Sequence, residues 1–313
     1  MNVSRSAYYA WPLATMHQPK PTDKKMEQQI IDTFQDHKCR YGSRRISKAI
    51  AMKGEKLSRY KAGRVLKKFG LKAIQPRSFV PKTTDSRHPY TISPNLLAQR
   101  DLPQKPNEVW VGDITYIPIC GGQWAYLGVW MDLFSRKIMG CQLEDHMKEA
   151  LIVAAFKKAI DAREITKGVI IHSDRGAQYA GNIFRGIINN KDMLQSMSRA
   201  DNPYDNAFME SYFSRFKAEL LQDGMFETIE DARTEIFEYI EMYYNTIGLH
   251  SSLGYQSPAK YEQQYQQKTT FDMHKQTAML YTEEPFIERG IEPLSIKHKQ
   301  SNSALPKESP LIF

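Results

Sequence analysis

Three acidic residues occupy positions at which a folded chain would bring carboxylates together. Asp113 lies inside the alternating segment EVWVGDITYIPI, where it shares a strand face with Val111 and Thr115. Asp is depleted in strands, and an unpaired charge there would be costly. Asp174 ends the short apolar segment GVIIHSD, the kind of strand end at which α/β sheets bind ligands. Glu210 lies at the rim of the broad apolar face of the helix predicted for FMESYFSRFKAEL. If this helix packs over the two strands, the three carboxylates converge.

Converging carboxylates favour a particular chemistry. They repel one another unless protons or cations neutralise them. Oxygen ligands with open coordination positions suit Mg²⁺ or Mn²⁺, and two such ions roughly 3.5–4 Å apart clamp the attacking and leaving oxygens of a phosphoryl displacement. Among the neighbours, Asn206 and Lys217 lie on the same side of the helix as Glu210. His172 faces the same side as Asp174 and could assist, although a structural histidine is an equally good interpretation.

The other acids near Glu210 have simpler explanations. Asp201 and Asp205 flank a predicted helix start at the dipeptide NP, where carboxylates favour the positive end of the helix dipole. Glu219 follows Arg215 by four residues, and we expect a surface ion pair of little energetic value.

The elements that would carry these residues alternate between strands and helices. After the strand that holds Asp113 come WAYLGVWMD and KIMGCQL, which a turn at residues 133–136 joins as a hairpin. The elements that follow are a helix over 147–162, the strand GVIIHSD, a helix near 180–190, a strand near 194–198, the helix that carries Glu210, and a last helix over 228–246. This order predicts an α/β fold with a mixed sheet and flanking helices.

The N-terminal third of the chain is strongly basic, although the whole chain carries only +8. Residues 24–82 hold 17 Lys and Arg against 4 Asp and Glu, a local charge of +13, so the rest carries about −5. Helical spacing predicts three short helices, the last two joined by a short turn as in a helix-turn-helix that binds DNA. The alternative is a small basic three-helix bundle that reads no groove. The candidate DNA contacts, better suited to phosphates than to bases, are Arg44, Arg45, Arg59, Lys61, Arg64, Lys67 and Lys68.

Composition completes the predicted domain organisation. The segments are an N-terminal piece (1–23), the helix-turn-helix domain (24–75), a linker with six prolines (76–106), the catalytic core with a C-terminal helix (107–265) and a disordered tail (266–313). No apolar run has the length of a signal peptide or a membrane span, and the three cysteines lack metal or redox spacing. We therefore expect a cytoplasmic protein.

Three motifs carry a family resemblance: WVGDITYIP, IIHSDRGAQYAG and DNPYDNAFMESYFSRFKAEL. They resemble the retroviral-integrase-like core of bacterial insertion-sequence transposases, specifically the family encoded in two overlapping frames. That family has two Asp and one Glu, with 35 residues between the second Asp and the Glu. Asp174 and Glu210 have this spacing, and Asp113 occupies the first Asp position. The basic segment resembles the helix-turn-helix that precedes this core, and the match spans residues 4–261.

The resemblance implies a ribonuclease-H-like core that cleaves DNA at the ends of a mobile element and transfers the freed 3′-hydroxyl into another phosphodiester. Asp113, Asp174 and Glu210 would be the ligands of two Mg²⁺ or Mn²⁺ ions, and Lys217 would meet a DNA phosphate. The implied partners are double-stranded DNA, from element ends and target, an upstream-frame product as fusion or partner, and further copies of the chain. The implied location is the bacterial nucleoid.

One segment, YNTIGLHSSLGYQSPAKY, departs from the family pattern. The positions of Ile247 and Gly248 are usually basic, and losing two potential phosphate contacts would weaken DNA binding. An inactive copy that acts only as a DNA-binding regulator is therefore one alternative, but it leaves the buried Asp113 unexplained. A nuclease that hydrolyses without strand transfer is another, because both reactions use one site.

Overall fold

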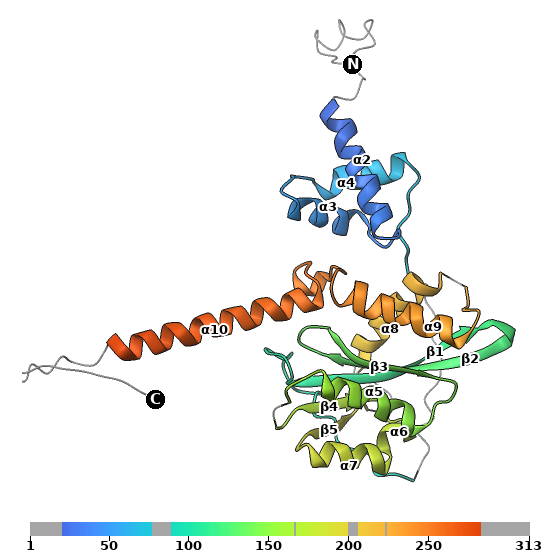
Figure 1. Cartoon of the computed structure of the whole chain (residues 1–313), viewed down its shortest axis with the longest axis vertical. Coiled ribbons are helices and arrows are strands. Elements are labelled where there is room, and N and C mark those ends of the chain that lie inside the picture. Colours follow the sequence, from blue (N-terminus) through green and yellow to red (C-terminus); the bar gives the residue numbers. More distant parts are fainter. Residues whose placement is uncertain (1–20, 77–88, 166, 200–205, 223, 283–313) are drawn as a thin grey trace, which may run out of the picture. The chain divides into compact units, whose positions relative to one another are not determined.

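The computed structural model describes residues 21–76, 89–165, 167–199, 206–222 and 224–282, with side chains from residue 23 to 275 (Figure 1). The predicted N-terminal segment lies almost wholly outside the described residues. Asp201 and Asp205, with the helix start predicted between them, also lie outside. No helix in the described part is both long enough and apolar enough to cross a membrane.

The N-terminal region consists of three helices, α2 (Pro21–Asp36), α3 (Ser43–Met52) and α4 (Arg59–Lys68). Ser58 caps α4, since its hydroxyl accepts a hydrogen bond from the Lys61 backbone N–H. Apolar side chains at helical spacing, together with Tyr41 between α2 and α3, form one core, and its large side chains with an exposed fraction of 2% or less are Ile30, Phe34, Tyr41, Ile46 and Ile50. Helical periodicity therefore accounts for this part of the chain.

Five strands form one mixed sheet in the order β3-β2-β1-β4-β5. Their bounds are β1 Val109–Ile119, β2 Gln123–Asp132, β3 Ile138–Glu144, β4 Ile170–Ser173 and β5 Leu194–Met197. β2 is antiparallel to both β1 and β3, whereas β4 runs parallel to β1 and β5 runs parallel to β4. A short 3-10 turn, η3 (Cys120–Gly122), joins β1 to β2. The mixed sheet and its flanking helices confirm the predicted fold class.

Helices cover both faces of this sheet (Figure 1). One face carries α5 Glu149–Asp161, α6 Ala177–Ala180 and α7 Asn182–Asn190, and the other carries α8 Ala207–Leu221 and α9 Ile229–Phe237. Alternate residues of β1 serve the two cores, so that Trp110 packs with α5 and Val111 with α8. Gly140 in β3 permits the close approach of α5, because a Cβ there would lie 2.3 Å from the carbonyl oxygen of Ala155.

The C-terminal elements begin where α9 continues into the π-helical turn η5 (Glu238–Tyr244). The 3-10 turn η6 (Ser251–Leu253) and the long helix α10 (Pro258–Thr282) follow. Residues up to Gln267 belong to one compact unit and the remainder to a second. Helix α10 passes residue 266, beyond which the sequence suggested an irregular tail. Its apolar periodicity is weak, but Gln, Lys, Ala and Met favour helix and its first residue is proline, so propensity supports it.

The second half of the predicted linker is packed against the sheet. Residues 89–106 contain no helix or strand, yet Ile92 packs against one core, and Leu96 against the other. The Leu96 N–H donates to the hydroxyl of Ser196 in β5 at 2.9 Å. This stretch therefore differs from the extended linker that the prolines suggested.

Candidate active site

The parallel pairing of β1 with β4 brings two of the predicted carboxylates to the same level. In this register Val111 lies opposite His172. Asp113 and Asp174 stand two residues further along each chain, and both are half-buried. The Gly176 N–H donates to Asp174 Oδ1 at 2.9 Å, which fixes one oxygen of this carboxylate. The geometry of parallel strands thus accounts for the predicted approach of the two aspartates.

Helix α8 adds the third carboxylate. Met209 and Phe216 are fully buried in the core shared with β1, whereas Glu210 is exposed beside it. Burial raises the pKa of Asp113 well above its usual range, and the charges of Asp174 and Glu210 raise it further. The Ile114 N–H, 2.8 Å from Asp113 Oδ1, and the Asn206 side chain act in the opposite direction. Asp113 therefore feels the repulsion of both other acids.

Two uncharged side chains complete the surroundings of Asp113. Asn206 is buried, its side chain hydrogen-bonds Asp113, and its Oδ1 has no hydrogen-bond partner among the described residues. Tyr179 of α6 is buried, and its pKa is well above the usual range because of burial and the charges of Asp113 and Asp174. Tyr179 is not among the residues predicted from the sequence; the signal available was its place five residues after Asp174.

Lys217 also faces this cluster. It lies seven residues after Glu210, two turns along the same side of α8, and is half-buried. Burial lowers the pKa of Lys217, and the charge of Asp113 opposes that shift. Its contact with a DNA phosphate stays a prediction.

His172 has a structural role in this site. It is fully buried, with Nδ1 2.8 Å from the Ser196 hydroxyl and Nε2 3.2 Å from the Ser198 hydroxyl. Both ring nitrogens are thus engaged within the protein. Of the two interpretations offered for His172, the structural one has the support of these contacts.

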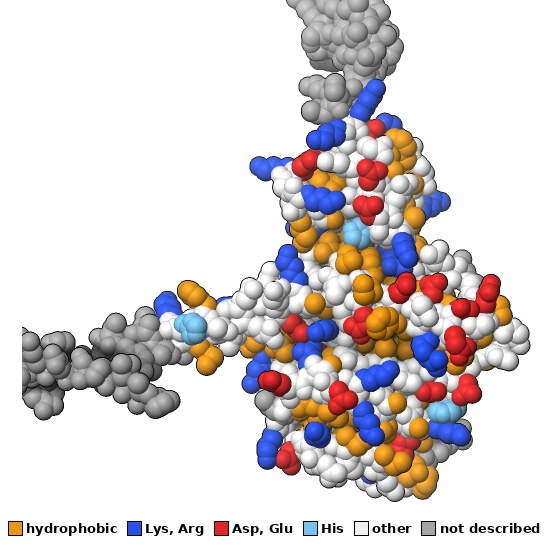
Figure 2. Space-filling view, viewed as in Figure 1, with side chains coloured by type: hydrophobic (Ala, Val, Ile, Leu, Met, Phe, Trp, Pro, Cys, Tyr) orange, Lys and Arg blue, Asp and Glu red, His pale blue; other side chains and the backbone are white. Residues whose placement is uncertain are grey.

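The predicted DNA-contacting cations fall into two groups. Lys61 pairs with Asp23 at 2.6 Å, Lys68 with Glu27 at 2.7 Å, and Arg45 is directed away from solvent. Arg44, Arg59, Arg64 and Lys67 are exposed, and Lys68 is exposed as well although it forms an ion pair. On the face drawn in Figure 2, basic and acidic side chains of this region lie side by side. DNA contact by either group stays a prediction.

The segment that departs from the family pattern contacts the N-terminal helices. The Ile247 side chain is half exposed, but its carbonyl accepts a hydrogen bond from the hydroxyl of Tyr41. Gly248 is buried, and a Cβ there would lie 3.2 Å from the Tyr244 carbonyl oxygen. A basic residue therefore fits more easily at 247 than at 248.

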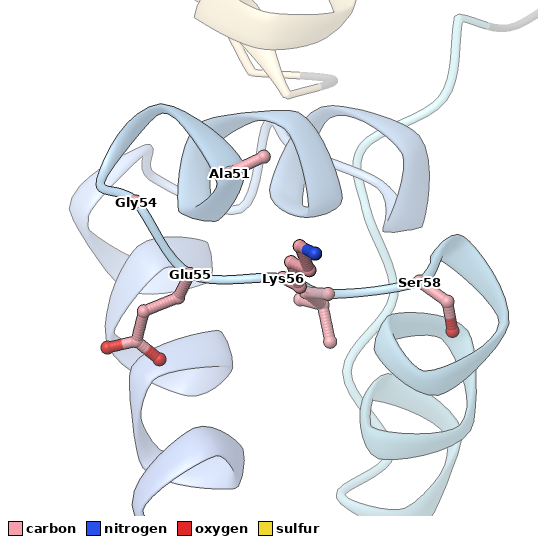
Figure 3. Close-up of a pocket in the computed structure, with 6 residues that line it drawn as sticks. Ala51, Gly54, Glu55, Lys56 and Ser58 are labelled. Atoms are coloured by element: carbon pink, nitrogen blue, oxygen red, sulfur yellow. The ribbon is translucent and has the colours of Figure 1, made fainter.

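Two further features lie apart from the carboxylates. An open hollow of about 540 Å³ sits at the turn between α3 and α4, and its labelled lining residues in Figure 3 are Ala51, Gly54, Glu55, Lys56 and Ser58. The potential ligand atoms of Glu144, Asp145 and His146, at the end of β3, lie within 4.8 Å of one another. Neither includes a member of the predicted site.

Comparison with known proteins divides the chain as the fold does, into an N-terminal helical region and a core. Family models described as "Integrase core domain" match residues 103–203 and 191–258, and one described as "HTH-like domain" matches residues 21–79. The chain is 38% identical over 252 residues to the transposase for insertion sequence element IS904 of Lactococcus lactis subsp. lactis (strain IL1403), covering 79% of this chain and 98% of that protein. It is 32% identical over 267 residues to transposase InsF for insertion sequence IS3A of Escherichia coli (strain K12), covering 84% and 91%. Among solved structures, the HTLV-2 integrase catalytic core domain in complex with magnesium (trimeric form) matches with 17% identity and a TM-score of 0.40, covering 51% of this chain and 98% of that chain.

Proposed function

Because the chain belongs to the family of insertion-sequence transposases with an integrase core, we propose that it cleaves DNA at the ends of an insertion sequence and joins those ends to target DNA. The observation that carries this proposal is the electrostatic contact of Asp113 with both Asp174 and Glu210. Repulsion among acids is costly to a fold, and it is retained where a ligand of opposite charge compensates it.

The three carboxylates would hold Mg²⁺ or Mn²⁺, with two ions as the proposed number. The donor set fits, since hard divalent cations prefer carboxylate and amide oxygens, and the buried Asn206 Oδ1 beside Asp113 is an amide oxygen without a partner among the described residues. When bound, such ions activate the attacking oxygen and stabilise the leaving one.

The chemistry consists of two phosphoryl displacements. In cleavage, the oxygen of a water bonds to phosphorus as the P–O3′ bond breaks and releases a 3′-hydroxyl. In strand transfer, that hydroxyl oxygen bonds to a target phosphorus, and the target's 3′ oxygen leaves and takes up a proton. Lys217 would bind a phosphate of the cleaved strand. Tyr179, whose phenol stays protonated because its pKa is raised, would donate one hydrogen bond to a carboxylate beside it.

The proposed partners follow from the reaction. Joining two ends to a target requires the chain to bind double-stranded DNA in more than one copy, with the upstream-frame product as a fusion or partner. The proposed location is the bacterial nucleoid. The exposed cations of α4, including Arg59 and Arg64, would contact the element ends.

A strand-transfer assay tests the proposal. The full chain, fused to its upstream-frame product, is incubated with Mg²⁺ and DNA carrying the element's own ends. Joined products are expected, and Glu210→Gln should abolish them. Glu230→Gln is the matched control, because Glu230 is an exposed glutamate of α9 that pairs with Arg233. Binding without nicks or joints would contradict the proposal, and nicks without joints would identify a nuclease.

A further inference from the structure

An ion pair links the helix-turn-helix region to helix α8 of the core. Arg45 Nη1 of α3 lies 3.3 Å from Glu219 Oε1 near the end of α8. The exposed fractions of the two side chains are 16% and 4%. The residues are 174 positions apart in the chain. The pair is therefore a long-range contact that excludes most water.

Glu219 has further partners within the core. Arg215 Nη1 lies 3.3 Å from the same oxygen, and the Tyr239 hydroxyl donates to Oε2 at 2.9 Å. Both carboxylate oxygens are thus engaged, and the two arginines are brought side by side. Removing the carboxylate would leave like charges facing each other.

A second set of contacts lies beside this pair. The fully buried Tyr41 accepts a hydrogen bond from the Leu249 N–H at 3.1 Å and donates to the Ile247 carbonyl at 3.4 Å. The Arg40 guanidinium lies over the ring of Tyr243 at 4.3 Å. Leu249 itself belongs to the apolar core of the three N-terminal helices. The ion pair is therefore one part of a packed junction.

Helix α8 connects this junction to the carboxylates. Glu210 and Glu219 lie nine residues apart on it, which corresponds to about 13.5 Å along the helix axis. We propose that Glu219 is a positioning residue: through Arg45 it fixes the DNA-binding helices to the helix that carries Glu210, so that bound DNA meets the carboxylates at one set distance. This inference rests on the proposed function.

The chemistry of the pair favours positioning over stabilisation. A buried ion pair contributes little more to stability than apolar residues of similar size would, and its best-attested role is to specify one arrangement among several. A junction built only from apolar contacts would allow the helical region to shift on the core, whereas a charge matched to one partner does not.

The test uses the full chain, four single variants and one double variant. Glu219→Gln removes the charge and keeps an acceptor for Tyr239; Arg45→Met removes the partner, and Arg45→Lys keeps its charge. Glu230→Gln is the control. Without DNA, hydrogen exchange at the Leu249 amide is expected to be at least about tenfold faster in Glu219→Gln and Arg45→Met, and close to the unaltered chain in Arg45→Lys and the control.

The second readout is the position of cleavage on element-end DNA. One dominant position is expected for the unaltered chain and the Glu230→Gln control, and several positions for Glu219→Gln and Arg45→Met. The double variant Arg45→Met/Glu219→Gln should resemble either single variant, because both act through one pair. Unchanged exchange and a single cleavage position in Glu219→Gln would overturn the inference. Absence of any cleavage in the unaltered chain would contradict the proposed function instead, while the exchange measurement still decides the junction.

Discussion

Two glutamates on helix α8 show how differently one residue type can be used. Glu210 is exposed at the first turn, beside Asp113 and Asp174, which share its charge. Glu219 is almost fully buried at the other end, and partners of opposite charge or donor character surround it. A carboxylate whose negative charge is balanced by partners within the chain stabilises the fold. A carboxylate whose neighbours are also negative requires a ligand from outside.

The largest expected effect concerns the end of α8 at which Asp113, Asp174 and Glu210 repel one another, called here the repelling end. Asp113→Asn should lower strand transfer by roughly three orders of magnitude, the scale on which one preorganised charged group contributes to a transition state. The same change should raise the stability of the metal-free protein by about 1 kcal/mol, since it removes repulsion from Asp174 and Glu210. Joined-product yield and chemical denaturation in a chelating buffer measure the two effects. Loss of both activity and stability would show that Asp113 is structural.

The other end of α8, where Glu219 has partners of opposite charge, is the compensated end. Removing its carboxylate should lower the stability of the protein. Glu219→Ala leaves Arg45 and Arg215 without their shared carboxylate and is expected to cost about 3 kcal/mol of unfolding free energy. Urea denaturation measures the change. Glu230→Ala, which removes an exposed ion pair on α9, should change stability by no more than about 0.5 kcal/mol. Equal effects of the two substitutions would abolish the distinction drawn between buried and exposed pairs.

The sequence predicts the repelling end better than the compensated end. Asp113 stands out because charge is rare within a strand, and Asp174 and Glu210 follow from local periodicity and spacing. These are short-range signals, and the mixed sheet follows from them as well. From its spacing, Glu219 was expected to form a surface pair with Arg215. That pair exists, but Glu219 is also buried and pairs with Arg45, which is far away in the chain, and no local pattern reveals either fact.

Tyr179 and helix α10 escaped prediction for related reasons. Tyr179 resembles any aromatic residue of a buried helix until the parallel register of β1 and β4 brings the aspartates beside it. Helix α10 lacks a strong apolar stripe, so periodicity gave no sign of it. The packing of residues 92–97 on β5 likewise depends on tertiary contacts, whereas the prolines of the segment 76–106 indicate only the absence of regular structure.

His250, a histidine near the junction, should make the stability of the protein depend on pH. Burial, together with the nearby charges of Arg45, Arg215 and Arg136, lowers the pKa of His250 to about 3. In the unfolded chain its pKa is near 6.5, so below that pH the unfolded state binds the additional proton. Stability should therefore fall as the pH decreases from about 6.5 towards 3, by about 2 kcal/mol at pH 5.

The measurement compares the free energy of unfolding at pH 7 and pH 5 for the unaltered chain and His250→Gln. The variant should lose about 2 kcal/mol less than the unaltered chain over this interval. Equal losses in both proteins would mean that His250 is solvated and protonated in the folded state.

The smallest expected effect concerns the predicted DNA-binding cations. It again compares a charged side chain that already has a partner of opposite charge with one that is exposed. Arg64 is exposed on α4, whereas Lys68 on the same helix already pairs with Glu27 at 2.7 Å. Each phosphate contact releases counterions, so losing one lowers the salt slope of DNA binding by about 0.9, a factor of about 3.5 in affinity between 50 and 200 mM salt. Arg64→Gln should show this full change. Lys68→Gln should show less, since a lysine that binds phosphate must first give up its carboxylate. Titrations of element-end DNA at several salt concentrations measure both slopes, and a larger change for Lys68→Gln would mean that the pair with Glu27 opens when DNA binds.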